Sequence, residues 1–111
     1  MTIEYVEDTS PSEVLDFVIE SLAGFRQLVD ATIKTAEGLN AGPLSYESKS
    51  ALIVAELVAH LQNEADDCLQ RIVVDLSHMA TPPPANEIAR AAGISPTRLR
   101  KILADAIPLS E

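Results

Sequence analysis

Apolar side chains recur at steps of three and four residues through the first third of the chain. That spacing places them along one side of an α-helix, because 3.6 residues complete a turn. The pattern predicts a first helix over roughly 11–37. Its apolar stripe consists of Leu15, Val18, Leu22, Phe25, Val29, Ile33 and Ala36.

The residues at both ends of this helix have the chemistry of helix caps. Ser10 and Glu13 flank Pro11 with the spacing of a capping box, and proline is well suited to the first helical position. Gly38 is expected to end the helix, with Leu39 packing back onto the last turn.

A second apolar stripe follows a turn at 40–43 and has nearly a heptad spacing. Ser45 is a suitable N-cap for the helix that carries it. No glycine or proline interrupts the chain from Ser45 to Ala80, so one long helix is allowed, and a break near Asp66 and Asp67 fits equally well. The stripe consists of Val54, Val58, Leu61, Ala65, Cys68, Ile72, Leu76 and Met79.

Both helices carry more apolar surface than a two-helix hairpin buries. Residues 52–59 contain Glu56 as their only charged residue, and 14–19 contain only Asp16. Segments that are apolar around most of their circumference are expected to be buried on more than one side. A second copy of the hairpin would provide that burial in a two-fold symmetric four-helix bundle. The alternative is that the C-terminal segment folds back over this surface within one chain.

Three consecutive prolines, Pro82 to Pro84, end the helical pattern and form a stiff connector. They divide the chain into a dimerising helical hairpin over 1–80 and a C-terminal module over 81–111. The hairpin is preceded by a polar, acidic arm at 1–9, which we expect to be loose, with room for a short strand.

The C-terminal module meets the demands of two short helices that cross at a tight turn. Ala89 is small where the helices approach most closely, and Gly93 suits a turn that needs a positive φ. Ser95 and Pro96 repeat the capped start of the first helix. The end of the second long helix, about 68–79, is expected to complete the small core. The inward-facing set consists of Ile88, Ala92, Ile94, Leu99, Ile102 and Leu103.

Composition adds a strong charge asymmetry to this picture. The 111 residues are 47% hydrophobic and 23% charged, which is typical of a globular protein, and the net charge is −9. Residues 1–80 hold 14 acidic and 4 basic residues, whereas 81–111 hold 3 acidic and 4 basic ones. A cationic segment in an acidic chain indicates an anionic partner for that segment alone. Its basic residues are Arg90, Arg98, Arg100 and Lys101.

Residues 85–104 resemble the helix-turn-helix of lambda and lac repressor-type bacterial transcriptional regulators. Ala89, Gly93 and the apolar positions all have the spacing of that motif. The resemblance implies that a helix over about 96–106 is a recognition helix, which enters the major groove of double-stranded DNA. In those regulators the motif usually lies near the N-terminus, whereas here it is C-terminal. The DNA contacts that the resemblance implies are Ser95, Pro96, Thr97, Arg98, Arg100 and Lys101.

A polar stripe along the second helix is the main candidate for enzymatic chemistry. Glu64 and Asp67, with acidic residues of the first helix, faintly resemble magnesium-dependent all-helical nucleotide pyrophosphatases, but only fragments of the paired motifs are present. Mixed charges at i, i+4 spacing favour a solvated, salt-bridged face. We therefore expect no enzyme activity, no cofactor and no metal. The stripe consists of Glu56, His60, Glu64, Asp67, Arg71 and Asp75.

The sequence thus predicts an all-α, homodimeric, sequence-specific DNA-binding protein, most simply a transcriptional regulator. A recombination, replication or packaging accessory would use the same motif. The first alternative is a non-catalytic protein-interaction module with a helix-turn-helix-like scaffold, and a lesser one is a helical-bundle metal-dependent nucleotide hydrolase. No apolar run spans a membrane, the N-terminus is acidic and the single cysteine forms no intrachain disulfide, so we expect a cytoplasmic protein.

Overall fold

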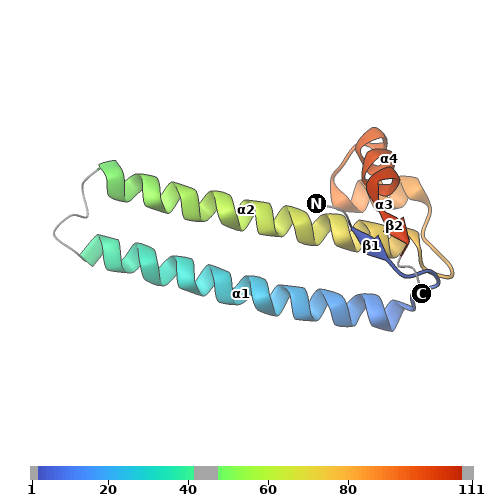
Figure 1. Ribbon diagram of the computed structural model, residues 1–111, viewed down its shortest axis with the longest axis horizontal. Coiled ribbons are helices and arrows are strands. Elements are labelled where there is room, and N and C mark those ends of the chain that lie inside the picture. Colours follow the sequence, from blue (N-terminus) through green and yellow to red (C-terminus); the bar gives the residue numbers. More distant parts are fainter. Residues whose placement is uncertain (1–2, 42–47, 109–111) are drawn as a thin grey trace. The chain divides into compact units, whose positions relative to one another are not determined.

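The computed structural model describes residues 3–41 and 48–108, and most of them are helical, as predicted (Figure 1). Among these residues, no helix combines the length and apolarity needed to cross a membrane. Ser45, the expected N-cap of the second helix, lies outside the described residues. The elements in chain order are β1 (Glu4–Tyr5), α1 (Pro11–Ala41), α2 (Ser48–Ser77), α3 (Ala85–Ala92), α4 (Pro96–Asp105) and β2 (Ile107–Pro108).

The chain divides into two compact units. One unit consists of 1–19 together with 67–111, and the other of 20–66. The first unit contains both strands, α3, α4, the first part of α1 and the last part of α2, so the N-terminal arm and the C-terminal helices belong to the same unit.

The start of α1 is capped as predicted, but its predicted end is wrong. The Glu13 backbone N–H donates to the Ser10 hydroxyl oxygen over 3.2 Å. The helix does not end at Gly38 but continues for three more residues. Leu39 is half-buried and lies seven residues after the buried Thr32, so it extends the same packed side by two turns. This packing outweighs the cost of about 1 kcal/mol for a glycine inside a helix.

The predicted apolar stripe of α1 is correct at some positions and wrong at others. Leu15, Leu22 and Ile33 are exposed, whereas Val14 and Thr32 are buried in their place. Apolar residues occur on two adjacent sides of this helix, so their spacing alone permits two stripes that differ by one residue. The predicted members that are half-buried are Val18, Phe25, Val29 and Ala36.

α2 is a single helix that passes through Asp66 and Asp67 without a break. The predicted stripe is wrong at Val58 and Ala65, which are exposed, and Leu57 is half-buried instead. The chain here is apolar around most of the helix, so periodicity did not identify the packed side. The stripe is half-buried at Val54, Leu61, Cys68, Ile72, Leu76 and Met79.

The last turns of α2 are the most buried part of the chain that the structure describes. Val73 and Val74 are 1% and 0% exposed, and neither belongs to the predicted stripe. Val73 packs against the C-terminal helices in a core that also contains Ile88 and Leu99. A helix that is covered on several sides buries residues outside any single stripe, which explains why the periodicity missed them.

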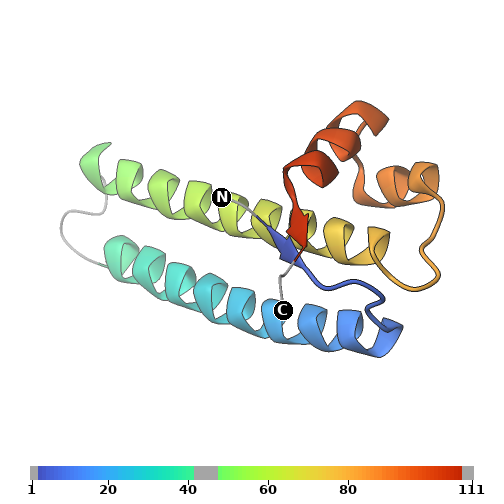
Figure 2. The ribbon, with the colours of Figure 1, turned by 45° about the vertical axis from the view of Figure 1, so that its right-hand side comes forward.

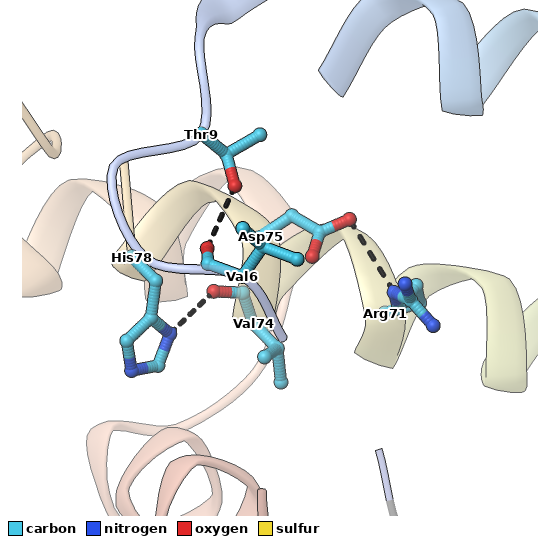
Figure 3. Close-up of polar contacts among 6 residues, drawn as sticks. All are labelled: Val6, Thr9, Arg71, Val74, Asp75 and His78. Carbon is cyan, nitrogen blue, oxygen red and sulfur yellow. Dashed lines mark hydrogen bonds and ion pairs between the residues drawn. The ribbon is translucent and has the colours of Figure 1, made fainter. Parts of the chain in front are cut away.

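The polar stripe of α2 is solvated at one end only. Asp75 is 8% exposed, so the expectation of a solvated face is wrong for this residue, whereas the Arg71 side chain remains 40% exposed. The predicted i, i+4 pairing is confirmed, with Arg71 Nε 3.4 Å from Asp75 Oδ2 (Figure 3). The Arg71 guanidinium also lies 4.9 Å from the centre of the Phe17 ring. Burial raises the pKa of the Asp75 carboxyl, and the Arg71 charge offsets only part of that rise. The stripe is exposed at Glu56, His60, Glu64 and Asp67.

The arm contains a short strand, β1, which the sequence allowed as a possibility. This strand pairs with β2, the segment after α4. β1 and β2 are parallel, with Glu4 opposite Ile107 and Tyr5 opposite Pro108 (Figure 2). The Ile107 N–H donates to the Ile3 carbonyl over 3.0 Å. A strand of two residues has no measurable periodicity, so the sequence did not reveal this partner.

Candidate nucleic-acid interface

α3 and α4 are joined by a turn in which Gly93 has the predicted positive φ. Its backbone angles are φ 69° and ψ 31°, in the left-handed region. The Gly93 N–H donates to the Arg90 carbonyl over 3.2 Å, and the Ile94 N–H donates to the Ala89 carbonyl over 3.0 Å. These bonds satisfy carbonyls at the end of α3 and fix the direction in which the chain leaves it.

The start of α4 is capped as the sequence predicts. The Ser95 hydroxyl oxygen accepts a hydrogen bond from the Arg98 N–H at 3.1 Å. Pro96 is the first helical residue, where its missing N–H leaves no hydrogen bond unmade. The cap and the preceding turn therefore define both the first residue and the initial direction of α4.

A small apolar core holds α3 and α4 against the end of α2. Ile88, Ala89 and Leu99 are at most 4% exposed and pack with Val73 of α2. The prediction that the end of the second long helix completes this core is confirmed. The half-buried residues around it are Leu76, Ala92, Ile94, Ile102 and Leu103, four of which belong to the predicted inward-facing set.

The outer side of α4 carries two cations and a hydroxyl. At 100° per residue, Thr97 and Lys101 lie nearly opposite Leu99 and Arg100 lies about a quarter-turn from Leu99, next to Thr97; all three are exposed. An Arg100 guanidinium nitrogen donates to the Thr97 hydroxyl oxygen over 3.4 Å. We call these three residues the cationic face. The other predicted contacts, which are also exposed, are Ser95, Pro96 and Arg98.

Arg98 lies on the other side of Lys101 from Arg100, about 60° from Lys101 around the helix. It borders a hollow of about 130 Å³, to which Lys101 also contributes. Asp105 adds a carboxylate to this hollow, so its charge is mixed, unlike that of the cationic face. The hollow is lined by Ile3, Gln70, Arg98, Lys101, Ile102 and Asp105.

The acidic residues that suggested a hydrolase are not gathered around a metal position. In 3–41 and 48–108, no group of three or more His, Cys, Asp or Glu side chains is placed to hold a metal ion. Glu64 and Asp67 are exposed on α2. Cys68 is a half-buried free thiol on the same helix.

Sequence reasoning missed the contacts of the arm with the end of α2. The Tyr5 ring stacks on the His78 imidazole, with ring centres 3.5 Å apart and planes 19° from parallel. Tyr5 is the only aromatic residue of the arm. An aromatic side chain in a polar, acidic segment indicates a packed residue, but it does not identify the partner.

Comparison of the chain with protein-family models, curated proteins and solved structures finds no match. The relevant features are the glycine turn, the capped helix α4 and the cationic face that this helix presents to solvent.

Proposed function

We propose that α3 and α4 form a helix-turn-helix and that the protein binds double-stranded DNA sequence-specifically as a homodimer. In this proposal α4 is the recognition helix, and the protein is a transcriptional regulator. The cationic face of α4 carries the proposal, because it combines base-reading side chains with a helix fixed at its start. A helix with its side chains is about 10–12 Å wide, which matches a major groove of about 12 Å.

Each residue of the cationic face has a distinct part in DNA recognition. The Arg100 guanidinium has the fork geometry that reads O6 and N7 of guanine, and the methyl group of Thr97 suits contact with a thymine methyl. Lys101 is a point charge suited to a phosphate, which adds affinity without sequence information. The hydrogen bond from Arg100 to Thr97 directs the guanidinium across the face before DNA is bound.

The acidic remainder of the chain restricts where DNA binds. Residues 1–80 carry a net charge of −10, and 86–101 carry a net charge of +3. Phosphates are repelled from the acidic surface and attracted to the cationic face. This asymmetry supports a docking orientation in which α4 leads, with weak non-specific binding elsewhere.

Exposed apolar side chains support the homodimer. Leu15 and Ile19 of α1 are 61% and 67% exposed. They belong to the same compact unit as α3 and α4, which leave them uncovered. In the other unit, Leu52, Ile53 and Val58 of α2 are likewise exposed. A second copy would bury such residues and place two recognition helices to read half-sites about 34–36 Å apart.

DNA binding is tested by selecting genomic fragments on the immobilised protein at moderate salt. Reversing two charges of the cationic face, in Arg100→Glu with Lys101→Glu, is expected to abolish enrichment of any fragment. The matched control reverses two exposed charges of α1, in Arg26→Glu with Lys34→Glu, and retains enrichment. Equal loss in both double variants would refute the role of the cationic face.

The same wild-type measurement separates the proposal from the protein-interaction module. A DNA-binding protein that neutralises phosphates loses affinity steeply as salt rises, because counterions are released on binding. A wild-type protein that enriches no fragment and shows no salt-dependent affinity for duplex DNA would favour the interaction module.

The dimer is tested by sedimentation at a series of protein concentrations. Ile19→Asp places a charge on the exposed apolar side of α1 and is expected to yield a monomer. Val6→Asp changes an equally apolar residue of the arm, which is 52% exposed, and is expected to remain dimeric. A wild-type chain that sediments as a monomer at every concentration would refute the dimer.

A further inference from the structure

We propose that the N-terminal arm, residues 3–9, is a clamp that holds α4 in position on the end of α2, with Tyr5 as its positioning residue. The inference rests on the proposed function, since it concerns how α4 is held for reading DNA. It goes beyond that function because it gives a role to residues at the opposite end of the sequence from the recognition helix.

The arm is attached to the end of α2 by three separate contacts. The Tyr5 ring stacks on His78 at 3.5 Å between ring centres. The Asp8 N–H donates to the His78 carbonyl over 3.0 Å, and Thr9 pairs with Met79 in a parallel bridge. Side-chain stacking and backbone pairing thus act on the same two residues directly after α2.

Local hydrogen bonds fix the conformation of the arm at Thr9 and of the imidazole at His78. Asp8 has a φ of 59°, in the left-handed region, which aspartate adopts more readily than most residues other than glycine, so it suits the turn of the arm. The Thr9 hydroxyl donates to the Val6 carbonyl over 2.8 Å, which closes the turn of the arm. Directly after α2, His78 Nδ1 lies 2.8 Å from the Val74 carbonyl and donates to it (Figure 3). This bond orients the imidazole on which the Tyr5 ring stacks.

The other end of the arm is attached to α4. The Ile3 carbonyl accepts a hydrogen bond from Ile107, two residues after the last residue of α4, Asp105. Ile3 also lines the hollow beside α4 together with Ile102 and Lys101. The arm is therefore hydrogen-bonded to the chain that leaves α4, and it borders the same hollow as α4 does.

Such a clamp matters because α4 is short and is capped by a side chain only at its start. Its ten residues span about 15 Å, so a tilt of about 10° around Ser95 displaces the last turn by roughly 2.5 Å. Base contacts require positions within about 0.5 Å. The core around Leu99 holds one side of the helix, and the arm holds its exit.

The experiment compares Tyr5→Ala, which removes the stacked ring, with Tyr5→Phe, which keeps it. Val6→Ala serves as a matched control, because Val6 is exposed and the carbonyl that Thr9 uses is retained. We measure the amide exchange rate of Ile107 and the affinity for a selected DNA site and for a random duplex at the same salt. Circular dichroism establishes that each variant is folded at the assay temperature.

Tyr5→Ala is expected to speed exchange at Ile107 and to weaken binding to the selected site by about two- to tenfold. Binding to the random duplex should change less, since phosphate contacts tolerate small displacements. Tyr5→Phe and Val6→Ala should behave as wild type. Should Tyr5→Ala fail to fold, Ile107→Pro removes the donor to Ile3 directly, and it should cause the same selective loss. The extended backbone of Ala106 accommodates a following proline.

Unchanged exchange at Ile107 in Tyr5→Ala would overturn the clamp, and so would an equal loss of affinity for both duplexes. If the wild-type protein binds no duplex, the proposed function fails instead. The exchange rate of Ile107 then still decides whether the arm holds the exit of α4, because that measurement needs no DNA.

Discussion

Replacing Gly93 by alanine isolates the conformational requirement of the turn, because the same replacement at Gly24 is a matched control. Both glycines are exposed, and a Cβ added at either position meets no atom within 4 Å. They differ only in backbone conformation, since Gly93 has a φ of +69° and Gly24 lies inside α1. Any difference between the two variants therefore reports on backbone conformation rather than on crowding.

The two replacements are expected to change the free energy of unfolding in opposite directions. An L-residue in the left-handed region costs about 1–2 kcal/mol, and alanine regains about 0.4–1 kcal/mol by restricting the unfolded chain. Gly93→Ala should therefore lower the free energy of unfolding by roughly 1 kcal/mol. Gly24→Ala should raise it by about 0.8–1 kcal/mol, because alanine is the better helix former. The predicted gap between the variants is about 2 kcal/mol.

Urea unfolding followed by circular dichroism measures both changes. The protein concentration is kept the same throughout, since the stability of a dimer depends on it. Asparagine tolerates positive φ, so Gly93→Asn should fall between wild type and Gly93→Ala. If Gly93→Ala is as stable as wild type while Gly24→Ala gains stability as expected, the left-handed turn between α3 and α4 is refuted.

Three further predictions follow from single contacts. Ser95→Ala removes the cap of α4 and should cost about 1 kcal/mol in urea unfolding, whereas Ser95→Asp should largely retain the stability. Burial raises the pKa of the Asp75 carboxyl in the folded state, so the folded chain holds this proton more tightly than the unfolded one. The melting temperature should therefore fall as pH rises from about 3.8 through the folded pKa. In Asp75→Asn this fall should be flatter than in wild type, and a steeper fall in the variant would contradict the prediction. Arg100→Ala should weaken a selected DNA site by roughly 1–3 kcal/mol and relax base preference, but Lys101→Ala should weaken all duplexes alike, as binding titrations would show.

The local structure of α3 and α4 could be predicted because its causes lie within a few residues of each other. Gly93 fixes the turn, Ser95 with Pro96 starts α4, and Leu99 faces inward at helical spacing. Each of these choices is dictated by the chemistry of one side chain and of the backbone next to it. For this reason the predicted bounds of the recognition helix, about 96–106, agree with those of α4, Pro96–Asp105, to within the uncertainty of a helix end.

The packing of the long helices was less predictable, because it depends on which of two apolar sides meets a neighbour. The stripe through Leu15 and Leu22 and the one through Val14 have nearly the same spacing, and only the fold distinguishes them. Asp75 looked solvated because it continues the polar stripe of Asp67 and Arg71 at i, i+4 spacing, although the surrounding structure buries it. The contact between Tyr5 and His78 joins distant parts of the chain and has no local signature.

The pairing of β1 with β2 has a consequence for the order in which the protein acquires its structure during synthesis. Glu4 and Ile107 are separated by about a hundred positions, so on the order of 5–20 s of translation elapse between them. The helices made in that interval have seconds in which to form and need only about a microsecond. Closure of this longest loop comes last, so α4 is made before the strand pairing that ties its exit to the start of the chain.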